Sequence, residues 1–193
     1  MNIDEIRQRI ERQELSKRNA KEEIVNWLSE ETGGLFTHGL TLMPKKVYYK
    51  HGRVTKRNKE GIYYRHLSKR ELEERAFRFV GILNKLILKS RYTRFNNKLP
   101  VVMTIEGERT LIDLHAHFAI NKPSWLSEKE FSQLVNKAIR ISDDFCIENP
   151  NFKIEKNNLD EKYRYKLDLI DDEWMTYITK DLDKRDFHNL YLP

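Results

Sequence analysis

Two apolar segments separated by a short turn, Leu99–Glu106 and Thr110–Ile120, constrain the fold of this chain most strongly. Their length and apolar content are typical of two neighbouring β-strands. Residues 68–90 carry apolar side chains at helical spacing, and residues 127–145 begin with the spacing of a capped helix. We therefore expect a sheet with helices packed on it.

Weaker patterns complete the expected order of elements as α, β, α, β, β, α, β, β, α. This order predicts an α+β sandwich with a central antiparallel sheet. Residues 1–33 are expected to form a helical extension, and residues 34–193 a single domain. The further predicted elements are a helix in 3–31, a strand in 35–47, a long basic hairpin or loop in 50–66, extended segments in 152–156 and 162–170, and a last helix from Asp171 or Asp172.

The whole chain has a net charge of +6, and its basic residues gather in the first half. Residues 45–59 contain seven Lys or Arg and no acid, and residues 75–105 contain seven more, again with no acid. This distribution favours a polyanionic partner, because clustered cations attract nucleic acid through its phosphates. A solvated lysine-rich surface is the alternative interpretation.

The single cysteine, Cys146, excludes an internal disulfide and favours a reducing compartment. No apolar run approaches the ~20 residues needed to cross a bilayer. Residues 1–5 lack the basic start and apolar core of a signal peptide. We expect a soluble, cytoplasmic protein with no membrane partner.

His115 and His117 form a candidate metal-binding pair. Residues two apart on a strand project from the same face, so both imidazoles can reach one ion. A metal that acts on phosphate also favours a hard oxygen ligand. Glu106 ends the preceding strand and is the preferred third ligand, with Glu108 and Asp113 as alternatives. Two ordinary half-buried histidines remain the other interpretation of the pair.

Tyr177 and Lys180 form a candidate nucleophile and its cationic neighbour. Residues three apart on a helix share a face, and a nearby ammonium assists a phenol whose pKa is ordinarily about 10. Tyr163 and Lys166 repeat the spacing, but they lie in a segment with strand-like alternation. Positions three apart on a strand face opposite ways, so Tyr177 is the preferred nucleophile.

Aromatic residues interleave with cations in two segments, a pattern that suits single-stranded nucleic acid. Bases stack on the rings while the cations follow the phosphates. Some of these tyrosines can equally belong to the core. The candidate contacts are Lys45, Lys46, Tyr48, Lys50, Arg53, Lys56 and Arg57 in the first segment, and Arg91 and Arg94 in the second.

Three segments in order, 40–44 (Leu-Thr-Leu-Met-Pro), 115–117 (His-Ala-His) and 177–180 (Tyr-Ile-Thr-Lys), resemble the three motifs of the HUH endonucleases. The likeness is to the single-tyrosine, Rep-like branch, whose members initiate rolling-circle replication. It covers roughly residues 35–182, and alanine stands at 116 where a bulkier apolar residue is common.

The resemblance implies an HUH/RRM-like sheet and a divalent ion, Mn²⁺ or Mg²⁺, that binds the scissile phosphate. Tyr177 would attack this phosphate, giving a 5′-phosphotyrosine bond and a free 3′-hydroxyl, while Lys180 positions or protonates groups around it. Thr41 would belong to a strand that helps to recognise DNA. The implied partners are single-stranded DNA or an origin hairpin, with a host helicase acting in trans.

Two other functions fit parts of the same pattern. A non-catalytic domain that binds single-stranded nucleic acid would keep the basic and aromatic surface. A metal-dependent phosphodiesterase that activates water would keep the metal but give Tyr177 a structural role. A covalent protein–DNA adduct separates the nicking enzyme from both. The origin sequence, the biological setting and the oligomeric state stay open.

Overall fold

The structure of this chain is a computed structural model that describes part of its length. The described residues are 17–26, 36–44, 47–50, 62–65, 67–107, 114–145, 166–170 and 190–191, together with the single residues 8, 12 and 174.

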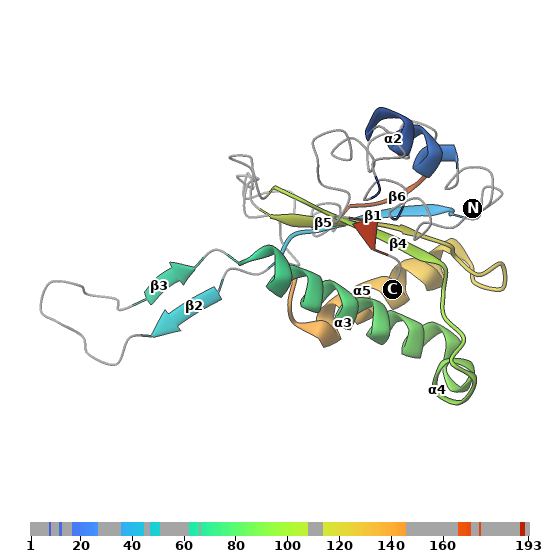
Figure 1. Cartoon of the computed structure of the whole chain (residues 1–193). Coiled ribbons are helices and arrows are strands. Elements are labelled where there is room, and N and C mark those ends of the chain that lie inside the picture. The colour runs from blue at the N-terminus through green and yellow to red at the C-terminus, as the bar shows by residue number, and fades with distance from the viewer. Residues whose placement is uncertain are drawn as a thin grey trace, which may run out of the picture.

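An antiparallel sheet forms the centre of the fold, in the order β6-β1-β5-β4-β7 across the described residues (Figure 1). The α+β class and the antiparallel sheet confirm the expectation from the sequence. The strands are β1 (His38–Leu42), β4 (Val101–Glu106), β5 (His115–Ile120), β6 (Lys166–Leu169) and β7 (Leu190–Tyr191).

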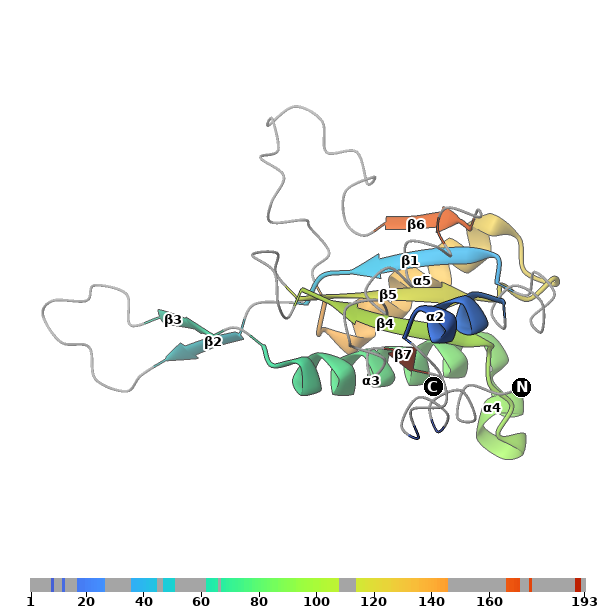
Figure 2. The same ribbon diagram turned by 45° about the horizontal axis from the view of Figure 1, so that its top comes forward.

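Two helices, α3 (Lys69–Leu88) and α5 (Glu128–Ser142), lie side by side on one face of the sheet (Figures 1 and 2). Each begins with a reciprocal capping box, Ser68 with Glu71 and Ser127 with Glu130. These boxes satisfy backbone N–H groups that the first helical turn otherwise leaves without a partner.

The core fills the space between this helical pair and the sheet. Phe118 from β5 packs against Phe79 from α3 with ring centroids 5.4 Å apart, and Phe145 contacts the same Phe79 ring at 6.0 Å. Phe131 and Val135 close the layer from α5. Burying one such side chain contributes about 1.5–3 kcal/mol, so the helical layer holds the sheet firmly.

The opposite face of the sheet carries α2 (Lys17–Asn26), shown in blue above the sheet in Figure 1. Ile24 is buried, so this helix packs onto the rest of the protein. The helix agrees with the helical prediction for residues 3–31 over the part that is described.

The predicted basic hairpin is present as β2 (Val47–Lys50) paired with β3 (Ile62–Arg65), a two-stranded sheet that extends away from the main one (Figure 1). The predicted strand 35–47 was too long, because β1 ends at Leu42 and Val47 begins β2. Pro44 separates the two strands, and a proline cannot donate to a sheet ladder.

Other boundaries also differ from prediction. The helix predicted in 127–145 ends at Ser142, since Asp143 takes a left-handed conformation with φ 54° and Phe145 instead makes a β-bridge with Pro44. The short helix α4 (Ser90–Phe95) and the edge strand β7 were not predicted. The predicted segment 152–156 lies outside the described residues, and of the predicted last helix only Trp174 is described, as helical.

Among the described residues, no helix combines the length and the apolar character needed to cross a membrane.

Candidate metal centre

The register of three strands brings the candidate metal ligands together. In the β4–β5 pair Glu106 stands opposite His115, and Thr104 stands opposite His117. In the β1–β5 pair Thr41 stands opposite His117. Residues directly opposite each other in an antiparallel pair project from the same face, so all five side chains share one face.

This face is the one turned away from α3 and α5. Ala116 and Phe118, the neighbours of the two histidines along β5, belong to the hydrophobic core on the helical side. The two-residue alternation of a strand then directs His115 and His117 to the other side. The core therefore holds the strand that presents both imidazoles.

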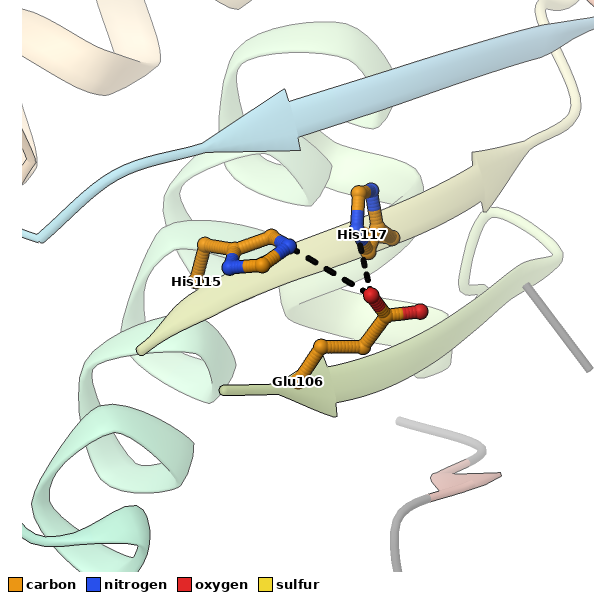
Figure 3. A group of neighbouring side chains, drawn as sticks. All are labelled: Glu106, His115 and His117. Atoms are coloured by element: carbon orange, nitrogen blue, oxygen red, sulfur yellow. Dashed lines mark ion pairs between the residues drawn. The ribbon is translucent and has the colours of Figure 1, made fainter. Parts of the chain in front are cut away.

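Glu106, His115 and His117 form a compact ligand group (Figure 3). Glu106 Oε2 lies 3.5 Å from His115 Nε2 and 3.5 Å from His117 Nε2. The ligand atoms of the three residues all lie within 4.8 Å of one another. Two ligands that are each about 2.1 Å from one ion lie roughly 3–3.5 Å apart, so this spacing suits a single divalent cation.

Burial and chemistry also fit a metal centre. All three side chains are buried, and their oxygen and two imidazole nitrogens form a two-histidine, one-carboxylate set. Such a set leaves coordination positions open for water or a phosphate oxygen. A buried carboxylate is costly unless cations or hydrogen-bond donors surround it, and a divalent ion would supply that charge.

Thr41 determines which nitrogen of His117 is available to a metal. Thr41 Oγ1 lies 2.8 Å from His117 Nδ1, on the far side of the ring from Glu106. If Nδ1 carries the proton and donates it to the hydroxyl, Nε2 keeps its lone pair toward Glu106. This is the usual arrangement by which an outer group orients a metal-binding histidine.

Thr104 adds a polar atom next to the same histidine. Its Oγ1 is buried and has no hydrogen-bond partner among the described residues. Buried hydroxyls in proteins almost always have a partner, including ordered water. The metal face therefore retains a hydrogen-bonding group beside His117 that a bound water or ligand can satisfy.

Trp174 lies against the same face of the sheet. A Cβ atom added at Gly39 would overlap the indole ring of Trp174, so only glycine allows this close approach. Gly39 is two residues from Thr41 in β1 and shares its face. The sequence analysis did not identify this contact, although a glycine inside a strand is itself a signal of close approach.

A third buried histidine among the described residues, His38, lies on the other face of the sheet. Its Nε2 lies 2.6 Å from Glu128 Oε2 and its Nδ1 lies 2.8 Å from Thr37 Oγ1, while its ring packs against Phe131. The hydrogen bond with His38 is the largest influence that lowers the pKa of the Glu128 carboxyl, followed among the lowering effects by the charge of His38 and by Lys122. The contact between His38 and Glu128 therefore links β1 to the N-terminus of α5.

The remaining predicted residues divide into two groups. Arg91 and Arg94 lie exposed on α4, and Tyr48 and Lys50 lie in β2. The others lie outside the described residues, so their predicted roles stay predictions: Tyr177, Lys180, Lys45, Lys46, Arg53, Lys56 and Arg57, together with the alternative ligands Glu108 and Asp113.

Comparison of this chain with models of protein families, with curated proteins and with solved structures finds no match.

Proposed function

We propose that this protein nicks and rejoins single-stranded DNA, with Tyr177 as the nucleophile and a divalent ion, Mn²⁺ or Mg²⁺, held by Glu106, His115 and His117. The observation that carries the proposal is the buried ligand group on the face of the sheet turned away from α3 and α5. A domain that only binds nucleic acid has no use for two imidazoles and a carboxylate buried together at ligand spacing.

The ligand set also favours chemistry on phosphate. A carboxylate with two imidazoles suits a hard or borderline cation, and the ion when bound would neutralise charge on a scissile phosphate. Thr41 orients His117 for this role, and the Thr104 hydroxyl is available to a water or phosphate oxygen in the same place.

Trp174 supports Tyr177 as the nucleophile. Gly39, under the Trp174 ring, is one strand and two residues from His117, a distance of roughly 8 Å. Tyr177 follows Trp174 by three residues, which span about 5 Å in a helix and at most ~11 Å when extended. These spans would allow the Tyr177 phenol to reach the metal face.

The reaction that follows exchanges one phosphodiester for another. The Tyr177 oxygen forms a bond to phosphorus, and the bond from phosphorus to the 3′ oxygen breaks. The phenol proton is lost and the departing 3′ oxygen gains a proton, a transfer that Lys180 would assist. Because one phosphodiester replaces another, the step is reversible, and a later 3′-hydroxyl can rejoin the strands.

A covalent adduct is the decisive test. The protein, incubated with single-stranded DNA from its origin and Mn²⁺, should give a protein–DNA species that survives boiling in SDS. Tyr177→Phe removes only the hydroxyl, so the adduct should vanish while DNA binding persists; Tyr163→Phe is the matched control. An adduct formed by Tyr177→Phe but not by Tyr163→Phe would show that the nucleophile is Tyr163.

The same assay separates the two alternative functions. Cleavage without any adduct would indicate a phosphodiesterase that activates water, and binding without cleavage would indicate a binding domain. The metal assignment is tested with a variant that carries both His115→Ala and His117→Ala, which should bind DNA but not cleave it. Full cleavage by this variant in excess EDTA would overturn that assignment.

A further inference from the structure

Two aromatic side chains are exposed together at the end of the molecule that carries α4. Trp125, in the loop between β5 and α5, is 58% exposed, and Phe95, the last residue of α4, is 71% exposed. Single exposed apolar side chains are common on protein surfaces, whereas a contiguous exposed apolar patch marks a contact surface. Figures 1 and 2 both place α4 at the same end of the molecule as the loop that follows β5.

Arg91 joins the loop to α4. Its guanidinium carbon lies 5.6 Å from the centroid of the Trp125 ring, within the range of a cation–π contact. Arg91 and Phe95 are four residues apart on α4, so they share one side of that helix. Trp125, Arg91 and Phe95 thus belong to one continuous surface.

Helix α4 is anchored to the hydrophobic core. Tyr92 is half-buried and packs against the hydrophobic core, which fixes α4 against α3. Asn96 ends α4 in a left-handed conformation; its backbone N–H donates to the carbonyl oxygen of Tyr92, and the N–H of Asn97 donates to that of Arg91. An anchored helix presents its aromatic and cationic side chains with little loss of entropy when a partner binds.

The surface is strongly basic. Lys89, Arg91, Arg94 and Lys98 are all exposed, and residues 75–105 contain no acid. Among the described residues, no carboxylate forms an ion pair with Lys89, Arg94 or Lys98. The cations are therefore available to a polyanion.

We propose that this surface, the α4 platform of Arg91, Arg94, Phe95 and Trp125, binds single-stranded nucleic acid. Bases stack on Trp125 and Phe95, and the two arginines pair with phosphates. An acidic protein would satisfy the charges but would not use flat exposed rings, whereas unpaired bases use both features. The sequence pattern indicated the arginines, and the structure adds Trp125 from a segment more than 30 residues away.

The α4 platform is separate from the metal centre. His117, the histidine nearer to Trp125 along β5, is three residues before the end of that strand, roughly 10 Å, and Trp125 follows five residues after the strand ends. We infer that the platform holds a part of the strand distant from the phosphate that reacts. This last inference rests on the proposed nicking function, whereas nucleic-acid binding by the platform does not.

The test measures binding in EDTA, where no metal-dependent cleavage interferes. A series of oligo(dT) lengths is titrated against the wild-type protein, Trp125→Ala, Phe95→Ala and Arg91→Gln. Ile141→Ala, an exposed apolar residue on α5, and Arg70→Gln, an exposed arginine at the start of α3, are the matched controls. Thermal unfolding of each variant checks that the fold is intact.

Each aromatic variant should weaken binding of the longer oligonucleotides by roughly 5- to 100-fold. Trp125→Ala should leave the dependence of affinity on salt unchanged, while Arg91→Gln should lower the slope of log affinity against log salt by about 0.7. Binding should also quench a fluorescence component that is missing in Trp125→Phe. The two control variants should bind like the wild type.

Wild-type affinity for oligo(dT) in both aromatic variants would overturn the proposal. The proposal would also fail if these variants lost affinity for polyglutamate as strongly as for oligo(dT), because the platform would then be assigned to an acidic protein. The outcomes are distinguishable from those for nicking. A Tyr177 adduct together with wild-type binding by Trp125→Ala rejects the platform alone. Loss of binding by Trp125→Ala without any adduct in the wild type rejects nicking alone.

Discussion

Thr41 stands opposite His117 in the β1–β5 pair, and its hydroxyl is the hydrogen-bond partner of the His117 Nδ1 atom. The family resemblance implied that Thr41 belongs to a strand that helps to recognise DNA, which stays a prediction. The contact in the structure gives it a second role, as a positioning residue. Both roles are compatible with its half-buried place on the metal face.

Replacing Thr41 by Val should weaken Mn²⁺ binding by roughly 10- to 100-fold, because the methyl group cannot accept the Nδ1 proton and the imidazole loses its fixed tautomer. Calorimetric titration of the protein with Mn²⁺ measures the change without DNA. Thr41→Ser keeps the hydroxyl and should retain most of the affinity. Equal Mn²⁺ affinity in the Val and Ser variants would show that Thr41 does not orient His117.

The ionisation of Glu128 should make the free energy of unfolding depend on pH. Its pKa is lowered from the ordinary value of 4.5, first by the hydrogen bond with His38. A carboxyl whose folded pKa is depressed stabilises the protein above its unfolded pKa, and this contribution disappears as the pH falls through the folded pKa. Because the Glu128 side chain is 65% exposed, the contribution is small.

Glu128→Gln should therefore be less stable than the wild type near neutral pH, and the difference should shrink as the pH falls below about 4.5. Urea unfolding at several pH values gives the two free energies. Glu74→Gln, which changes an exposed carboxylate on α3, serves as the comparison. A Glu128→Gln difference that stays constant down to pH 3 would contradict the link to His38.

At the scale of the elements, the contact between β1 and Trp174 connects the C-terminal part of the chain to the sheet. Gly39 is the residue that permits it, because any side chain there would occupy the space of the indole ring. Overpacking of a tight contact typically costs about 1–3 kcal/mol. The metal face and the segment that precedes Tyr177 therefore depend on one glycine.

Gly39→Ala should lower the free energy of unfolding by about 1–3 kcal/mol, and most of this loss should disappear when Trp174 is also changed to Ala. Chemical denaturation of the two single variants and the double variant measures the coupling. Gly81→Ala is a matched control, because its nearest atom, Tyr92 Oη, is 3.7 Å away and the site is helical. That control should gain roughly 0.5–1 kcal/mol. Additive losses in the double variant would mean that Trp174 does not occupy this position in solution.

At the scale of the whole molecule, the protein has a helical side, formed by α3 and α5, and a metal side. The β2–β3 hairpin and α4 extend beyond the sheet at different places (Figure 1). Strand β2 belongs to residues 45–59 and α4 to residues 75–105, two segments that are rich in cations and contain no acid. Binding of a long single strand should therefore depend on salt through more than one region.

Reversing the charges of Lys56 and Arg57 should lower the slope of log affinity against log salt by at least roughly 1.4, about 0.7 for each lost phosphate contact. Anisotropy of a labelled oligonucleotide at a series of salt concentrations gives the slope. Reversal of Lys137 and Arg140, two exposed cations on α5, should change it less. An unchanged slope in the Lys56 and Arg57 variant would exclude the hairpin from the DNA path.

Local patterns in the sequence determined much of this protein. Apolar spacing predicted α3, capping-box spacing predicted the start of α5, and the alternation around His115 and His117 predicted that both share a face. Glu106 was preferred as the third member of the group because a short turn returns the chain beside itself. These predictions succeeded because the interactions involved lie close together in sequence, where helix and strand geometry decides the neighbours.

Only the tertiary structure decided the rest. Trp174 on Gly39, Thr41 on His117 and Arg91 on Trp125 each join segments more than 30 residues apart, and no local period encodes such contacts. The edge strand β7 has only two residues, which is too short for any sequence pattern to reveal. It is defined by its pairing with β4. Contacts of this kind depend on the register of the sheet and on the packing of the core, which bring side chains that are distant in sequence within a few ångströms of one another.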